Sequence, residues 1–596
     1  MVPQGWGELA LLPSLPLMPT GKQLRNRGAD FVRSVSNRLG SPRDEALVVA
    51  AQAAYVLVTG QKPKGGITAY REPRIDAIAY RRAQAALDAG DLGAALTAID
   101  ALYRDHPRSV RVLRLRRAVL SRTGDMPGQA AMLHEIHALD DTPANHDAER
   151  RLLGRLIELT PGWLPRIPGR HPTAPDGDDV ILHLNKESSP YLTTGFTMRS
   201  RYNLIAARDA GLRPVVVTAL GFPRLLGETT FEPVEVVDGI PHHRLDLGPR
   251  YRLDRPLDQI LEDQAWLTAR VARTVRPAII HASSGHRGFE HALVGIALRD
   301  HIDRPLVYEV RSFFESTWAS DDEYGETGDQ FHRRFAAETR AMLAADHVIT
   351  ISESMRSEIV ERGVPPERVT VIPNGVDAGA FEPAAADPAL RARYGLGEAF
   401  VFGYVSNLDH PRENQELLID ATRELQRRGR NVRCLIVGDG RRREELERHA
   451  RDAGVSGAVT FTGRVPHAEV AGHYALLDAF VVPRADERAA RMVTPLKPYE
   501  ALAMARPLVV ANLPALVEIA APDAPEPRGL AFPAGDAAAL ATALERLIDD
   551  PAVAERMGRA GREWVSRERT WAANGALFRE VYARVLEAWA GRAGAA

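Results

Sequence analysis

Residues 494–511 read TPLKPYEALAMARPLVVA and contain, in order, a loop, an alanine-rich helical stretch and an apolar run. We expect the helix to begin near Lys497 and to end at Arg506-Pro507, because proline cannot continue a helix. The run that follows, PLVVA, is continuously apolar, which is typical of a strand buried on both faces of a parallel sheet. This segment therefore predicts one helix–strand step of an α/β fold.

Short apolar runs alternate with helical stretches before this segment. They are DVILHLNK (179–186), RPVVVTA (213–219), PAIIHASS (277–284), PLVYEVR (305–311), ADHVITIS (345–352) and RVTVIP (368–373), then FVFGYVSN (400–407), VRCLIVGDG (432–440), AVTFTGR (458–464) and AFVVPR (479–484). Two such series predict two doubly wound, Rossmann-like domains, at residues 180–375 and 376–570. Ligands bind beyond the carboxyl ends of the strands in such sheets, so we expect a cleft where the domains face each other.

The chain just before these series has a different spacing of apolar residues. From residue 75 to 163 apolar residues recur three and four apart, which predicts helices. Gly90-Asp91 returns as Gly124-Asp125 after 34 residues, the period of tetratricopeptide repeats. We expect this region either to present a docking surface for a partner protein or to pack as a helical cap on the following domains. A proline- and glycine-rich linker, residues 164–179, should follow it.

Residues 1–74 mix Pro, Gly and Arg around one apolar run, residues 46–58, and contain no motif that indicates chemistry. The run is shorter than the roughly 20 residues that span a bilayer. The N-terminus lacks the basic segment of a secretory signal. We therefore expect a cytoplasmic protein, with peripheral contact at the inner face of a membrane left open.

Composition excludes several classes of function. Of the 596 residues, 45% are hydrophobic and 26% are charged, as in ordinary soluble globular proteins. A chain of this length should form roughly three or four domains. The formal net charge of −2 gives no pull toward nucleic acid, so no nucleic-acid partner is expected. The single cysteine, Cys434, excludes a disulfide within the chain and a cysteine-based zinc site, and it should lie buried in a strand.

The start of the helix near Lys497 has the chemistry of an anion site. Free N–H groups and the positive end of the helix dipole attract phosphate, and Lys497 adds a cation. An ionised Glu500 only accepts hydrogen bonds, which suits a pair of sugar hydroxyls. The alternative is a surface Lys–Glu pair at i,i+3, worth a few tenths of a kcal/mol. Gly438 and Gly440 do not form the GxGxxG fingerprint, so a nicotinamide cofactor is not expected.

The segment around Lys497 resembles the donor-nucleotide motif of retaining glycosyltransferases of family 4. Further stretches match that family in order: IIHASSGHRG (279–288), VYEVRSFFE (307–315), ADHVITISESMRSEIVERG (345–363), VIPNGVD (371–377), GYVSNLDHPRENQELLIDA (403–421), LIVGDG (435–440), VTFTGRVPHAEVAGHYALLDAFVVPR (459–484) and GLAFPAGD (529–536). The resemblance covers about residues 178–590. It implies a GT-B fold, two Rossmann-like domains facing each other across a cleft, with a final helix in residues 571–596 that returns to the first domain.

The resemblance implies that Glu500 binds the donor ribose and that Lys497 and Arg412 bind the diphosphate. It implies donor contacts from further residues: Asn407, where an arginine is frequent, Gly438, Asn374, Thr494, Pro495 and Leu496. In the family the position of Asn374 lies at the hinge and lines the cleft, although Asn-Gly is equally compatible with a plain turn.

Three features depart from the family pattern. Met492 stands where many members carry a glutamate that contacts the transferred sugar. Arg484, Arg488 and Arg491 crowd the same loop, where either a guanidinium clamps the phosphates, with Arg484 and Arg491 as the expected donor contacts, or the loop forms a solvated basic surface. Ala505 replaces a frequent glycine, which we interpret as a change in packing only.

Many family members place a histidine beside the reacting sugar. Ser283 occupies the usual position in this chain, so we favour His286 as the histidine of the site, against a structural role. With the two phosphate-binding cations, the expected catalytic set is His286, Lys497 and Arg412.

The first domain should also contribute to the cleft. Gly195, in the loop after the first strand, would permit close approach to the donor phosphates or to the acceptor. Glu309 and Arg311 end the strand VYEVR, where they should either pair with each other or contact the acceptor.

These features predict a retaining, metal-independent glycosyltransferase that moves a sugar from a nucleotide-diphosphate-sugar, of UDP or GDP type, to a glycan, lipid-linked or small-molecule acceptor. No cofactor and no metal are expected, and cell-envelope or polysaccharide synthesis is the favoured context. The alternative is a transferase-like scaffold that has lost activity and binds partners through the helical region.

Overall fold

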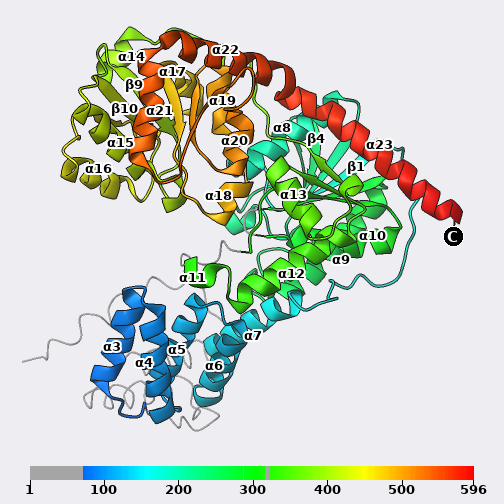
Figure 1. Cartoon of the computed structure of the whole chain (residues 1–596). Helices are drawn as coiled ribbons and strands as arrows, with labels where there is room; N and C mark the ends of the chain where they lie inside the picture. Colours follow the sequence, from blue (N-terminus) through cyan, green and yellow to red (C-terminus); the bar gives the residue numbers. More distant parts are fainter. Residues whose placement is uncertain (1–71, 286–287, 316–321, 596) are drawn as a thin grey trace, which may run out of the picture. The chain divides into compact units, whose positions relative to one another are not determined.

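The computed structural model describes residues 72–285, 288–315 and 322–595 (Figure 1). The apolar run at 46–58 and His286 therefore lie outside the described residues. The described residues divide into two compact units, one within residues 72–116 and 132–145 and the other within residues 117–131 and 146–595. The second unit contains both sheets.

The predicted helical region is confirmed. It contains α3 (Ala77–Asp88), α4 (Leu92–Asp105), α5 (Val110–Arg122), α6 (Met126–Leu139) and α7 (Pro143–Glu158). Gly90 and Gly124, at the repeated turns, have φ angles of 79° and 74°, a conformation that glycine adopts without steric cost. Asp91 and Asp125 each accept a backbone hydrogen bond from the first turn of the next helix. The two turns share one structure, while the wider tetratricopeptide resemblance stays a prediction.

In the described part of the chain the first sheet has eight strands, in the order β3-β4-β2-β1-β5-β6-β7-β8. They are β1 (Val180–Asn185), β2 (Arg213–Thr218), β3 (Val234–Val237), β4 (Ile240–His243), β5 (Ile279–Ser283), β6 (Leu306–Val310), β7 (His347–Thr350) and β8 (Val369–Val371). Every neighbouring pair except β3–β4 is parallel. The strands predicted from the apolar runs of this half are confirmed.

The helices of the first half lie between these strands in the chain. They are α8 (Gly195–Asp209), η2 (Arg224–Leu226), α9 (Leu257–Val275), α10 (Glu290–Ile302), α11 (Asp322–Gly325), α12 (Asp329–Ala344), α13 (Glu353–Glu361) and η3 (Pro366–Arg368). A capping box between Thr194 and Thr197 fixes the start of α8, just beyond the carboxyl end of β1.

The antiparallel pair β3–β4 is missing from the predicted strands. Asp238-Gly239 joins these two four-residue strands, with φ angles of 51° and 78°. Two successive positive φ angles in a two-residue loop indicate a type I′ turn, for which Asp-Gly is a favoured sequence. The turn signal was therefore present, but the strands beside it are too short to form a recognisable apolar run.

The second sheet has six parallel strands in the described chain, in the order β11-β10-β9-β12-β13-β14. They are β9 (Phe400–Val405), β10 (Val432–Val437), β11 (Val459–Phe461), β12 (Ala479–Val482), β13 (Leu508–Ala511) and β14 (Gly529–Phe532). All but β14 were predicted as strands. Cys434 lies buried in β10, where burial raises the pKa of its thiol to about 12, and its predicted position in a buried strand is confirmed.

The other helices of this half lie before, between and after these strands in the chain. They are α14 (Pro388–Arg393), η4 (Pro411–Glu413), α15 (Gln415–Arg427), α16 (Arg443–Asp452), η5 (His467–Glu469), α17 (Val470–Ala475), α18 (Arg488–Met492), α19 (Lys497–Ala503), α20 (Pro514–Ala520), α21 (Ala537–Asp549) and α22 (Pro551–Glu568). The helix expected near Lys497 is α19, which begins at that residue and ends before Arg506.

The last helix, α23 (Trp571–Ala595), runs beside α8 of the first half, as Figure 1 shows. Its Phe578 and Tyr582 are buried in one apolar cluster with Ile181 and Ile279 of the first sheet. The end of the chain is therefore part of the core of the first half.

Among the described helices, none combines the length and the apolar character needed to cross a membrane.

Candidate active site

The carboxyl ends of β9, β10 and β12 bring together several predicted donor residues. Arg412 lies in the turn after β9, Gly438 directly follows β10, and Arg484 follows β12. Because β10, β9 and β12 are neighbours in a parallel sheet, these residues emerge at the same edge. This edge is where a ligand of a doubly wound sheet is expected.

Arg412 is a half-buried cation that forms no side-chain hydrogen bond or ion pair within the described part of the chain. Its Nε is buried, and no side chain among the described residues accepts a hydrogen bond from its guanidinium. Burial lowers its pKa, the charge of Arg484 lowers it further, and Glu413 opposes both effects. A buried, unpaired guanidinium is costly unless an anion completes it, which favours an anion-binding role.

Glu413 organises this edge and was missed by the sequence analysis. Its carboxylate accepts a hydrogen bond from Arg484 Nη2 at 3.0 Å and another from the Tyr404 hydroxyl. Burial alone would raise its pKa, but Arg484, the Tyr404 hydroxyl, Arg412 and Lys497 together lower it to about 2. The sequence does place an acidic residue directly after Arg412, a predicted phosphate-binding cation. It contains no local pattern that predicts the contact of Glu413 with Arg484.

Lys497 and Glu500 do not pair with each other. Lys497, at the first position of α19, is half-buried, and its ammonium has no hydrogen bond or ion pair within the described residues. Glu500 accepts a hydrogen bond from the buried Tyr474 hydroxyl at 2.7 Å, and burial raises its pKa. The surface-pair alternative is therefore wrong, and both side chains keep capacity for a ligand.

The segment before α19 packs against the first half of the fold. The buried amide of Asn374 donates to the Thr494 carbonyl at 2.9 Å and accepts from Arg199 at 3.1 Å. A Cβ placed on Gly195 would lie 3.7 Å from the side chain of Leu496. The start of α19 therefore faces the start of α8, with Asn374 fixing the segment rather than remaining free for a ligand.

The other predicted donor residues have local roles. Asn407 is exposed, and its side-chain oxygen accepts from the Asp409 N–H at 2.6 Å. Gly438 has a φ of 141°, and a Cβ there would lie 1.9 Å from the Ser406 carbonyl oxygen, so its glycine serves a close backbone approach. Pro495 is half-buried at the start of the turn before α19.

The basic loop does not form a single clamp. Of its arginines, Arg484 joins the Arg412 edge, whereas Arg488 pairs with Glu358 and with Glu315 of the first half. Arg491, half-exposed, pairs with Asp486 in the same segment. Of the two arginines predicted to contact the donor, Arg484 lies near the predicted cations, while Arg491 is paired with Asp486.

The structure gives a physical reason for two departures from the family pattern, Met492 and Ala505. Met492 packs against the apolar core of the first half, so an apolar residue here serves the seam between the two halves. Ala505 has a φ of 54°, and the Arg506 N–H bonds to the Ala501 carbonyl at 2.9 Å, which closes the end of α19. The packing-only interpretation of Ala505 was wrong, because the position demands a left-handed backbone conformation.

Glu309 is the centre of a buried network at the edge of the first sheet. It is 1% exposed and accepts hydrogen bonds from Arg199 at 2.7 Å, from Arg311, and from Ser283 at 3.1 Å. The opposing guanidinium groups hold its pKa well below the usual range although burial alone would raise it. Glu309 and Arg311 thus pair with each other, which was one of the two predicted arrangements.

His281 belongs to the same network. Its Nδ1 lies 2.8 Å from the Tyr582 hydroxyl of α23, and its Nε2 lies 3.4 Å from Glu309. Burial lowers its pKa, so the ring is neutral near pH 7. Both ring nitrogens of His281 therefore contact groups of the protein itself.

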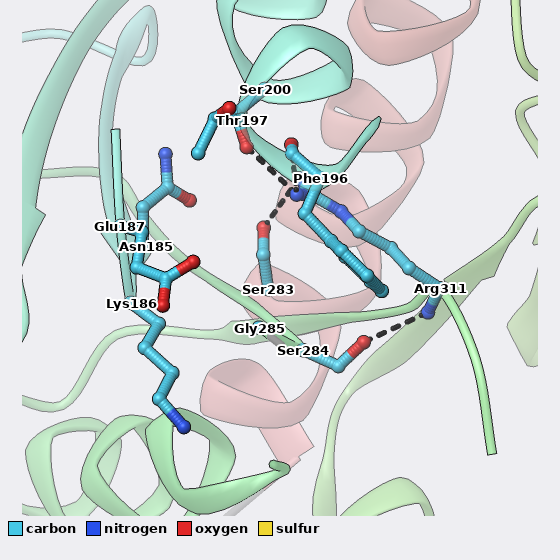
Figure 2. Close-up of a pocket in the computed structure, with 10 residues that line it drawn as sticks. All are labelled: Asn185, Lys186, Glu187, Phe196, Thr197, Ser200, Ser283, Ser284, Gly285 and Arg311. Atoms are coloured by element: carbon cyan, nitrogen blue, oxygen red, sulfur yellow. Dashed lines mark hydrogen bonds between the residues drawn. The ribbon is translucent and has the colours of Figure 1, made fainter. Parts of the chain in front are cut away.

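A small polar cavity opens beside this network, at the carboxyl ends of β1, β5 and β6 (Figure 2). Asn185, Ser200, Ser283 and Arg311 contribute to its wall. Gly195 itself is exposed just before Phe196, which also lines the cavity. The described residues contain no group of three His, Cys, Asp or Glu side chains suited to a metal ion.

Two family descriptions match the two sheet-bearing parts of the chain. The description "Glycosyl transferases group 1" matches residues 399–550, and "Glycosyl transferase 4-like domain" matches residues 195–375. The matched ranges contain all the predicted site residues of each half.

Curated relatives include a GDP-mannose-dependent alpha-(1-6)-phosphatidylinositol monomannoside mannosyltransferase of Mycolicibacterium smegmatis, 34% identical over 41% of this chain and 64% of that protein. The match to its Mycobacterium tuberculosis counterpart spans 58% of that protein. The chain thus spans less than two thirds of these mannosyltransferases. A glycogen synthase of M. tuberculosis is 30% identical over 52% of this chain and 69% of its own length.

Solved structures share the fold. Sucrose-phosphate synthase from Thermosynechococcus elongatus superimposes with a TM-score of 0.55 at 22% identity, over 69% of this chain and all of that one. The Anabaena protein HepE in complex with UDP gives a TM-score of 0.53 at 19% identity, over 68% of this chain and 99% of that one. With the two parallel sheets and the preceding helices, these likenesses confirm the predicted α/β, GT-B fold. This chain belongs to the group 1 glycosyltransferases.

Proposed function

We propose that this chain transfers a sugar from a nucleotide-diphosphate-sugar to a hydroxyl acceptor. The observation that carries the proposal is a set of groups at one edge: within the described residues the Arg412 and Lys497 side chains form no hydrogen bond or ion pair, and one Glu500 oxygen accepts no hydrogen bond. A diphosphate would complete the two cations, and ribose hydroxyls would donate to the carboxylate.

The same groups supply a mechanism. Negative charge builds on the leaving diphosphate as the sugar–phosphate bond breaks, and fixed cations in a partly buried site stabilise it without reorganising. Arg412, Arg484 and Lys497 bring three positive charges to this edge, where Glu413 and Glu500 carry the nearby negative charges. Because α19 has only seven residues, these cations, rather than the helix dipole, carry most of the stabilisation.

Retention of configuration and independence of metal are further parts of the proposal. The family resemblance supports attack by the acceptor on the face that the diphosphate leaves, so no covalent nucleophile is assigned. The cations expected at the diphosphate can stabilise its charge directly, which supports catalysis without a bound metal or other cofactor.

The relatives guide the choice of substrates. Because curated relatives are named as GDP-mannose-dependent mannosyltransferases, GDP-mannose is the first donor to test, followed by UDP-sugars. We propose a glycan, lipid-linked or small-molecule acceptor, a cytoplasmic location with peripheral contact at the inner membrane face, and a protein partner for the helical region.

A panel of nucleotide-sugars tests the proposal. The purified chain is incubated with each donor, and the slow release of nucleoside diphosphate is followed by mass spectrometry. We expect release from at least one donor, its loss in Lys497→Ala and Glu500→Ala, and no change in Glu444→Ala, which alters an exposed residue of α16. If no donor is bound or hydrolysed by the unaltered chain, the transferase proposal fails and the scaffold alternative gains.

A further inference from the structure

The small cavity beside the first sheet carries an inference about what it binds. It lies at the carboxyl ends of β1, β5 and β6 and has room for about one water-sized group (Figure 2). Its wall is polar, with the Asn185 amide on one side and the hydroxyls of Ser283 and Ser284 on the other. A cavity of this size admits one functional group of a ligand rather than a whole molecule.

The Asn185 side chain is an unfilled hydrogen-bonding group in this wall. The residue is 3% exposed, and neither its side-chain nitrogen nor its oxygen has a partner within the described residues. A buried amide without partners is costly, and it needs one group that accepts and one that donates. A single hydroxyl does both.

Charged groups in the cavity wall have partners of opposite charge: Lys186 and Glu187 lie side by side in it, and Arg311 contacts Glu309. Arg311 directs its guanidinium to Glu309, Ser283 and Ser200, and its charge is paired with the Glu309 carboxylate. An added phosphate or carboxylate would meet no unpaired cation from Arg311. A neutral hydroxyl therefore fits the cavity better than an anion does.

The cavity lies beside the proposed donor site. Phe196 and Thr197 of α8 line it, and the preceding residue, Gly195, faces Leu496 at the start of α19. A group held by Asn185 would thus lie on the side of the first half that faces Lys497.

A structural water is the competing occupant. Asn185 also borders an inner cavity of similar size, together with His183 and Asn203, whose Nε2 and Nδ2 lack partners as well. A water in the inner cavity would satisfy these groups and one face of the Asn185 amide. Because Asn185 also lines the outer cavity, a water in the inner cavity leaves the outer one without an occupant.

We propose that Asn185 and the serines of the outer cavity form a subsite for one carbohydrate hydroxyl, belonging either to the acceptor or to the transferred sugar. The inference rests on the proposed transferase function, since a hydroxyl is the group that such a reaction must position. It assigns Asn185 as a specificity-determining residue of the first half.

The test uses the full chain, Asn185→Leu, which replaces the amide by an apolar group of similar shape, and Asn185→Ala, which removes the amide. Asn431→Leu, an exposed asparagine before β10, is the matched control. Binding of UDP and GDP is measured by calorimetry, and hydrolysis of the nucleotide-sugar panel is measured alongside. Binding of glucose, mannose and myo-inositol in the presence of the nucleoside diphosphate is measured by saturation-transfer NMR.

Two results support the subsite and locate its ligand. Loss of sugar or inositol binding by roughly tenfold to a hundredfold in the Asn185 variants, with hydrolysis unchanged, assigns the hydroxyl to the acceptor. A fall of similar size in hydrolysis, with diphosphate affinity unchanged, assigns it to the transferred sugar.

Two results overturn the subsite. In the first, neither polyol binding nor nucleotide-sugar hydrolysis changes in Asn185→Ala or Asn185→Leu. The amide would then bind a structural water only, even if the melting temperature of the variants falls. Alternatively, the unaltered chain binds none of the three polyols and its hydrolysis is unaffected by Asn185→Ala. Absence of UDP and GDP binding in the unaltered chain is a separate outcome, which defeats the proposed function while the NMR arm still decides the cavity.

Discussion

Replacing Tyr474 by phenylalanine tests how the donor site is held. The Tyr474 hydroxyl donates to Glu500 at 2.7 Å, and the tyrosine is fully buried. A hydrogen bond to a charged group contributes about 1.5 to 3 kcal/mol, and its loss leaves the Glu500 carboxylate without its protein partner. If Glu500 binds ribose, the affinity for the nucleoside diphosphate should fall roughly tenfold or more, because the carboxylate is no longer fixed.

The pH dependence of Tyr474→Phe follows from the pKa of Glu500. Burial already raises that pKa, while the Tyr474 hydroxyl opposes the rise. Removing the hydroxyl should raise the pKa further, so that Glu500 becomes protonated, and unable to accept from both ribose hydroxyls, at a higher pH than before. Diphosphate affinity should therefore decline at a higher pH in the variant as the solution is acidified.

Calorimetric titration between about pH 5 and pH 8, a range that brackets raised carboxylate pKa values, measures both effects. Tyr394→Phe is the control, because the Tyr394 hydroxyl lies 3.0 Å from His473 and has no contact with Glu500. It should lower stability modestly and leave affinity unchanged. Equal affinities and equal pH profiles for Tyr474→Phe and the unaltered chain would refute the role assigned to this hydrogen bond.

Two further changes test the backbone and the buried network. Ala505→Gly should raise the free energy of unfolding by about 1 kcal/mol, because alanine is strained at a φ of 54°; denaturant unfolding measures it, and a loss of stability would contradict the backbone interpretation. Glu309→Gln should lower stability by about 3 to 5 kcal/mol at neutral pH, because Arg199 and Arg311 lose their buried carboxylate. Since the folded pKa of Glu309 is depressed, its contribution is present above the unfolded pKa, near 4.3, and shrinks as the pH falls through the lower folded value; a pH-independent difference would count against the ion pairs.

The strands of both sheets could be predicted because strands buried on both faces form continuous apolar runs. The RCLIVGDG run became β10, and Cys434 lies buried in it as expected. The β3–β4 pair was not predicted, because four-residue edge strands with alternating burial form no continuous apolar run and leave only the turn between them recognisable.

The partners of the charged side chains could not be predicted. Glu413 meets Arg484 across 71 positions of the chain, and Arg488 crosses to Glu358 over 130. Such contacts depend on which strand ends share an edge of a sheet, and one sequence without its fold does not specify that. The left-handed Ala505 was equally hidden, because alanine gives no local indication of a positive φ.

The most direct test of the account is calorimetric titration of GDP and UDP into the unaltered chain, Arg412→Ala and Arg491→Ala. The two variants remove the same charge, one from a half-buried guanidinium that has no ion pair among the residues the structure describes and one from a half-exposed guanidinium paired with Asp486. We expect at least one diphosphate to bind the unaltered chain. Its affinity should fall by roughly tenfold or more in Arg412→Ala and change by no more than about twofold in Arg491→Ala. Absence of binding to the unaltered chain, or equal losses in the two variants, would contradict a diphosphate site built on Arg412.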